Sequence, residues 1–232
     1  MLWVPELAAA ALANTTSNVS GLSIMVGMGT AVSTICGQAY GAGNHRKVAE
    51  MLQLALWVNW AVCIPISILW WNAEAILIVL GQDPSVSSAA GDYIRWLIPF
   101  IWCFAAQGAF NAWLNAQRIM KPGAAASVMI APIHLGVCMI VFNTMGRDYI
   151  GGAQAMTVSG AIQTLLLVMI VWCFGMHKKT WFGLLCPPAS TADTLLYCKL
   201  AFAGVISLSE WWASEICILM AGLLPRPECV LD

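Results

Sequence analysis

Two glutamates, Glu210 and Glu215, are the side chains in this sequence that are best placed to do chemistry. They lie in a long stretch between Lys199 and Arg226 that contains no other charged residue. As a helix, this stretch would be roughly 40 Å long, which is enough to cross a bilayer with some tilt. A charge near the middle of a membrane costs roughly 2.5–3.5 kcal/mol on insertion scales. We therefore interpret both glutamates first as functional residues that face a wet cavity, a partner or a proton.

The two glutamates have different surroundings on this helix, because a step of five residues rotates the chain by about 140°. A thin polar stripe accompanies Glu210 and consists of Ser207, Ser214 and, one turn further on, Cys217. Apolar side chains accompany Glu215, namely Leu208, Trp211, Trp212 and Leu219. Indole rings around a carboxyl group desolvate it. For both glutamates the alternative is a structural role as a buried hydrogen-bonding group.

The composition of the whole chain is typical of a membrane protein. The sequence is 60% hydrophobic and 9% charged, and its mean hydropathy is +0.79. Charged residues form short clusters that separate long runs at 7–45, 51–73, 96–117, 122–146, 149–177 and, with its two glutamates, 200–225. Each run can form a helix of about 20 residues. The sequence therefore predicts an all-α, polytopic membrane helix bundle with about six transmembrane helices in a lipid bilayer. The net charge of −1 gives no indication of a nucleic-acid partner.

The nine cysteines do not indicate a metal site. No two of them form a Cys-x-x-Cys pair, and most lie inside the apolar runs. We expect them to be small buried side chains without disulfide or metal-binding roles.

Basic residues in the loops predict the orientation of the helices. Seven of the ten Lys and Arg residues lie after the first, third and fifth runs, at Arg46, Lys47, Arg118, Lys121, Lys178, Lys179 and Lys199. The alternate loops carry only Arg95, Arg147 and Arg226. The positive-inside rule places the first set in the cytoplasm. The N-terminus then lies outside without a signal peptide, and this predicts one further helix ahead of Met1.

Two segments carry local structural signals. The first helix, roughly 12–39, has small residues near four-residue spacing, at Gly21, Gly29, Ser33, Gly37 and Gly41. Such a stripe is expected to receive another helix at close range. The segment 72–92 holds only a short apolar part, 75–81, which is too short to span a membrane. We expect a short helix there, ended by Gly81 and Pro84.

Polar residues within the apolar runs have two possible roles. Gln107, Asn111 and Asn115 lie at four-residue steps on one helix face, where they would contact a substrate or bond across helices. His134 could relay protons, although satisfaction by a neighbouring side chain is favoured for a lone histidine.

Seven short motifs follow one another along the chain. They are Cys36-Gly37-Gln38-Ala39-Tyr40-Gly41-Ala42, Gly81-Gln82-Asp83-Pro84, Gly91 to Pro99, Asn115-Ala116-Gln117-Arg118, Gly152-Ala153-Gln154-Ala155, Lys179-Thr180-Trp181-Phe182-Gly183 and Glu210-Trp211-Trp212-Ala213-Ser214-Glu215. Each motif is weak alone. In this order, over nearly the whole chain, they resemble the motifs of the multidrug and toxic compound extrusion (MATE) transporters, and of plant-type eukaryotic members in particular.

The resemblance implies a fold of two six-helix lobes related by pseudo-twofold symmetry, with a substrate cavity between them. The chain would supply helices 2–7 of twelve. Residues 1–176 would form five helices of the N-terminal lobe, 177–198 the cytoplasmic interlobe linker and 199–232 the first helix of the C-terminal lobe. A complete transporter would also need helices 1 and 8–12.

The resemblance also assigns roles to residues. Glu210 is similar to the cation-coupling carboxylate of the family, and Glu215 to a second acidic position. Possible cavity residues are Gln107, Asn111, Asn115, Ser207, Trp211 and Ser214. No cofactor is implied, because a proton gradient supplies the coupling ion. The family has a proline ahead of the first glutamate, where this chain has Phe202-Ala203-Gly204, and Gly204 is expected to supply some flexibility.

The sequence therefore predicts a secondary active antiporter, or a part of one, in the plasma or vacuolar membrane. It would export organic cations, xenobiotics or metabolites in exchange for protons. A membrane-embedded enzyme is disfavoured, because the sequence contains no HExxH, no GxSxG and no clustered His-Asp-Glu motif. The alternative is a truncated, non-transporting membrane protein that at most associates with full-length relatives.

Overall fold

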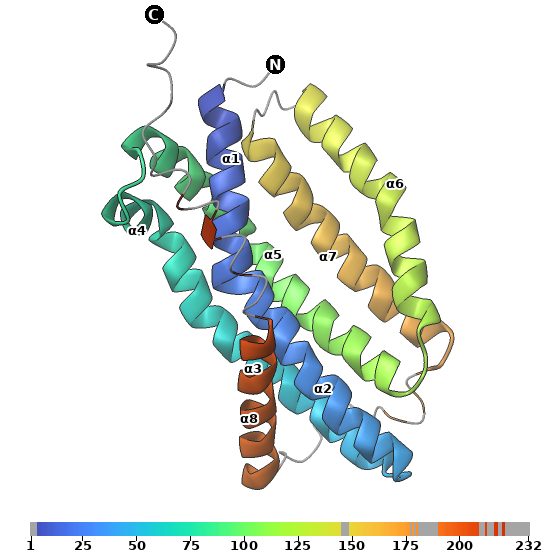
Figure 1. The fold of residues 1–232 in the computed structure, drawn as a ribbon. Coiled ribbons are helices and arrows are strands. Elements are labelled where there is room, and N and C mark those ends of the chain that lie inside the picture. Colours follow the sequence, from blue (N-terminus) through green and yellow to red (C-terminus); the bar gives the residue numbers. More distant parts are fainter. Residues whose placement is uncertain are drawn as a thin grey trace, which may run out of the picture.

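The structure is a computed structural model that describes residues 4–144, 149–176, 178, 180, 190–208, 212, 216–217 and 220. The regular elements in these residues are helices (Figure 1). In chain order they are α1 (Val4–Ser17), the π-helical turn η1 (Asn18–Leu22), α2 (Ser23–Gly41), α3 (His45–Trp71), α4 (Ala73–Val79), α5 (Pro84–Ala116), α6 (Lys121–Thr144), α7 (Ile150–Cys173) and α8 (Thr191–Ser207).

Five predicted transmembrane helices are confirmed by length and composition. The helix that starts in α1 runs through η1 and α2 without a break, and α3, α5, α6 and α7 are likewise long and apolar enough to cross a membrane. The sixth predicted span corresponds to α8, which is described as a helix from Thr191 to Ser207.

The start of α8 lies within the predicted linker. The helix begins at Thr191, so residues 191–198, which the sequence analysis assigned to the linker, are helical. Ser190 is the N-cap, and its hydroxyl accepts a hydrogen bond of 3.2 Å from the Ala192 amide. The charge on Lys199 is a poor marker of the start of this helix, because a capped helix can begin with several polar residues before its apolar part.

The helices run alternately between two ends of the bundle. The α2–α3 connection, the α5–α6 connection and the start of α8 lie at one end, drawn at the bottom of Figure 1. The start of α1, the helix α4 and the start of α7 lie at the opposite end. The loops richest in Lys and Arg thus share one end, and the assignment of that end to the cytoplasm remains a prediction.

The short helix predicted between 72 and 92 is confirmed. It is α4, of 7 residues, and it is followed by Gly81 with a φ of 88°, a left-handed conformation that favours glycine. Pro84 then opens α5, and the Asp83 carboxylate caps that helix by accepting from the Ser85 amide at 2.8 Å. Arg95 of α5 holds this end together through ion pairs to Glu74 at 3.0 Å and to Asp92 at 2.7 Å.

The core lies between the continuous α1–α2 helix, α3 and α5. Its largest fully buried side chains include Met51, Leu52, Trp70, Ile94, Leu97, Ile101 and Trp113. At η1 the indole of Trp70 packs on Gly21, and its nitrogen donates to the Ser20 hydroxyl at 2.9 Å. Helix α6 packs against α7 at the side of the bundle (Figure 1).

The prediction that the cysteines are buried is only partly correct. Cys36 and Cys63 are buried, whereas Cys173, Cys198 and Cys217 are exposed. In a membrane protein the outer surface is itself apolar, so an apolar run does not distinguish core from surface.

Candidate functional site

The predicted coupling residues Glu210 and Glu215 lie outside the described residues, as do Trp211 and Ser214. The structure does describe the helix that leads to them, α8, as far as Ser207. The Ser207 hydroxyl donates to the Gly204 carbonyl of the same helix at 2.8 Å. The described part of the predicted site is therefore α8 and its contacts with α2 and α3.

Helix α8 lies against α2 at very close range. A Cβ atom at Gly27 of α2 would lie 2.7 Å from the backbone nitrogen and Cα of Val205. A Cβ atom at Gly204 of α8 would collide with the Gly27 carbonyl oxygen and the Thr30 hydroxyl. Real Cβ atoms do not approach other atoms so closely, so the contact requires glycine on both helices. Gly204 is thus a packing residue, and α8 continues as a regular helix through it.

Within the described residues, most glycines of the predicted stripe do not receive another helix. No described atom lies within 4 Å of a Cβ built at Gly29, Gly37 or Gly41. Among the glycines of the stripe, Gly21 is the one that meets another described helix, through Trp70 of α3. The glycine that receives α8 is Gly27, which has no special position in the sequence pattern. Its partner helix begins far along the chain, so local spacing carries no signal for it.

A buried hydrogen bond connects α8 to the core. The Tyr197 side chain is fully buried, and its hydroxyl donates to the Asn59 side-chain oxygen of α3 at 2.7 Å. The same hydroxyl lies 3.5 Å from the Met28 carbonyl of α2. Asn59 is 1% exposed, and its amide nitrogen is 3.5 Å from the Ala105 carbonyl of α5. Four helices therefore meet at this pair.

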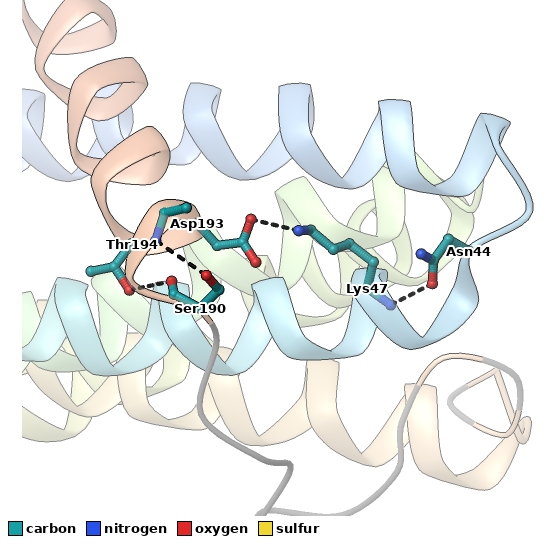
Figure 2. Close-up of polar contacts among 6 residues, drawn as sticks. Asn44, Lys47, Ser190, Asp193 and Thr194 are labelled. Carbon is teal, nitrogen blue, oxygen red and sulfur yellow. Dashed lines mark hydrogen bonds and ion pairs between the residues drawn. The ribbon is translucent and has the colours of Figure 1, made fainter.

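An ion pair closes the same contact at the loop end of the bundle. Figure 2 shows Lys47 of α3 and Asp193 of α8 pointing toward one another, with Nζ and Oδ1 2.5 Å apart. Their side chains are 31% and 17% exposed. Each residue is in the first turn of its helix, and the Asn44 side chain caps α3 by accepting from the Lys47 amide at 3.0 Å. Sequence reasoning missed the pair because it took Lys47 as a loop cation and Asp193 as linker.

Of the three polar residues predicted to share a face of α5, the structure gives a contact with another helix for Asn111. Asn111 lies against α6, since a Cβ at Gly123 would be 2.6 Å from its side-chain oxygen. This position favours an interhelical role for Asn111. Gln107 is half-buried and Asn115 is exposed, and for these two both interpretations stay open.

His134 is satisfied by its neighbours, as favoured from the sequence. Its Nδ1 lies 2.8 Å from the Ser159 hydroxyl of α7, and its Nε2 lies 3.6 Å from the Cys138 sulfur one turn along α6. A second link between these helices runs from Gln163 to Ser127 at 3.3 Å. These bonds connect α6 and α7.

Comparison with known proteins decides the family. The family model described as MatE matches residues 4–140 of the chain. The chain belongs to the MatE family. The resemblance to MATE transporters that the motifs suggested is thereby confirmed, and the chain is a multi-pass membrane protein.

Its relatives in the family include plant proteins. The chain is 33% identical to Protein DETOXIFICATION 12 of Arabidopsis thaliana over 223 residues, which are 96% of this chain and 46% of that protein. The crystal structure of the eukaryotic MATE transporter AtDTX14 matches with a TM-score of 0.82 at 29% identity, over 96% of this chain and 49% of that one. The chain spans about half the length of the curated relatives it matches.

More distant relatives share the fold alone. The inward-facing conformation of a multidrug resistance MATE family transporter of the MOP superfamily matches with a TM-score of 0.78 at 16% identity. That match covers 93% of this chain and 48% of the other chain. The arrangement of α1 to α8 is therefore that of one half of a MATE fold.

Proposed function

We propose that this chain acts as part of a secondary active antiporter that exports organic cations, xenobiotics or metabolites in exchange for protons. Membership of the MatE family supports transport. The single observation that carries the proposal further is the docking of α8 on α2 and α3, because α8 leads directly to the two glutamates. In this structure the described bundle thus holds α8, the helix that precedes the two glutamates in the sequence.

Glu210 is the proposed coupling residue. In one state it would be protonated and free of substrate, and in the other it would be ionised and paired with a cationic substrate. Its depth in an uncharged stretch supports this role, because a carboxyl at mid-membrane is costly unless it serves a function. Glu215 would tune the pH dependence of the exchange.

The test uses a complete transporter made by joining this chain to the remaining helices of a curated relative. Glu210→Gln should reach the membrane at a near-normal level and lose pH-driven uptake, because a neutral amide has no titrating state that a proton gradient can bias. Glu215→Gln should reduce uptake less and shift its pH optimum. Substrate uptake into proteoliposomes under an imposed pH gradient measures both effects.

Two outcomes would contradict the proposed proton coupling through Glu210. Normal pH-driven uptake by Glu210→Gln would leave that glutamate as a structural hydrogen-bonding residue. Uptake that follows a sodium gradient at clamped pH would contradict proton coupling. The same assay on the 232-residue chain alone tests whether it transports without further helices.

A further inference from the structure

Three contacts that hold α8 lie on one face of that helix. Asp193, Tyr197 and Gly204 follow one another at steps of four and seven residues, which return to the same face. The opposite face carries exposed apolar side chains, with Leu195 72% and Phe202 68% exposed. The side of α8 that meets the first lobe is therefore polar at its start and closely packed at Gly204.

The contacts of Asp193, Tyr197 and Gly204 would respond differently to a movement of α8 relative to α2 and α3. The packing at Gly204 consists of van der Waals contacts, which can shift by small steps. The Tyr197–Asn59 hydrogen bond is short-ranged and is lost when its two oxygens move apart, and the Lys47–Asp193 ion pair weakens as its charges separate. A broken buried hydrogen bond leaves desolvated polar groups without partners, so intermediate positions of α8 are disfavoured.

The charges are placed asymmetrically with respect to the helix dipoles. Lys47 is in the first turn of α3, where the positive end of the helix disfavours a cation. Asp193 is in the first turn of α8, where the positive end favours an anion. The carboxylate of Asp193 therefore interacts favourably with two positive charges: the ammonium group of Lys47 and the partial positive charge at the start of α8. Removal of Asp193 should disturb the contact more than removal of Lys47.

We propose that the Lys47–Asp193 ion pair and the Tyr197–Asn59 hydrogen bond form a latch between the two lobes, closed in the arrangement seen here and open in another state of the transport cycle. The proposal rests on the proposed function. A rearrangement that moves the second lobe relative to α2 and α3 must carry α8 with it, and both polar contacts must then break.

The first experiment detects the closed latch directly. A zero-length carbodiimide activates a carboxylate, which then forms an amide with an amine in direct contact. Treatment of the chain in nanodiscs, followed by mass spectrometry, should yield an amide between Lys47 and Asp193. Single reversals, Lys47→Asp or Asp193→Lys, should lose this cross-link, and the double variant should restore it in the reversed sense. Absence of the cross-link in the unmodified chain would overturn the proposal.

The second experiment tests whether the latch opens. In the complete transporter, the yield of the Lys47–Asp193 cross-link should fall on the order of threefold when substrate and a proton gradient drive the cycle. Both single reversals should reduce the rate of uptake, and the charge-swapped double variant should restore it to within about twofold. Arg46→Glu is the matched control, because Arg46 pairs with Glu50 of the same helix at 3.0 Å. This variant should change neither cross-link nor uptake.

The outcomes separate the latch from the proposed function. If the complete transporter takes up substrate but the yield of the cross-link does not respond to cycling, the pair is a permanent structural tie and the latch is wrong. If the complete transporter shows no proton-driven uptake, the proposed function falls and the latch falls with it.

Discussion

At the scale of single residues, the buried hydroxyl of Tyr197 anchors α8 most deeply. Its partner Asn59 is itself buried, so water cannot replace either side of the bond. Buried polar groups of this kind favour the arrangement in which they are paired, because breaking the bond leaves desolvated groups without partners. By contrast, the hydroxyl of Ser207 donates within its own helix, to the Gly204 carbonyl.

Tyr197→Phe should therefore destabilise the chain. The substitution leaves the Asn59 side-chain oxygen without its partner at 2.7 Å, which costs about 1–3 kcal/mol in free energy of unfolding. Thermal unfolding in detergent, followed by tryptophan fluorescence, should show a lower midpoint. In the double variant Tyr197→Phe, Asn59→Leu the loss should be smaller than the sum of the two single losses. Strict additivity would show that the two side chains do not interact.

At the scale of elements, the joint between α2 and α8 depends on glycine at two positions. Gly27 and Gly204 let the two backbones approach closely, as small residues do between membrane helices. Of the described contacts of α8, this is the one made by close backbone packing, and the outer face of the helix is apolar and exposed. Side chains larger than hydrogen at these positions must push the helices apart.

Gly27→Ala should weaken the docking of α8, while Gly29→Ala should not. The first substitution places a methyl group 2.7 Å from the Val205 backbone and should cost about 1–3 kcal/mol through overpacking. The second lies two residues away, where a Cβ meets nothing within 4 Å, and should be neutral or stabilising by up to about 1 kcal/mol. Unfolding midpoints of the two variants measure the difference. Equal effects would show that α8 does not approach Gly27.

At the scale of the whole molecule, the described residues form a bundle with five helices long and apolar enough to cross a membrane, and α8 is held on its side. The ends of the bundle differ in charge, because the loops around Lys47 and Lys121 carry most of the basic residues at one end. The opposite end is closed by α4 and the ion pairs of Arg95. The positive-inside rule assigns the first end to the cytoplasm.

Cysteine labelling in intact cells should confirm this orientation. In a variant without native cysteines, a cysteine at Lys121 or Lys178 should be protected from a thiol probe that cannot cross membranes. A cysteine at Leu80, which is 57% exposed beside α4, should be labelled from outside. Permeabilised cells supply the control, because all three positions should then react. Labelling at Lys178 from outside in intact cells would reverse the topology.

Much of the element order could be predicted from the sequence alone. The length and hydropathy of each uncharged run are local quantities, and in a membrane they alone require a helix, because every backbone polar group must be satisfied within its own segment. Turn signals are equally local, so α4 and its end at Gly81 and Pro84 followed from short stretches of sequence, whereas the Asp83 cap was seen only in the structure. The motifs also indicated the MATE family before any contact was known.

Only the tertiary structure decided how α8 is held. The bonds from Lys47 to Asp193 and from Asn59 to Tyr197 join residues separated by 146 and 138 positions, and no local pattern connects them. The spacing of glycines did not identify Gly27 either, because close approach at that residue depends on where another helix lies. Lipid-facing and core-facing residues are both apolar in a membrane, so hydrophobicity identifies the helices but not their contact faces.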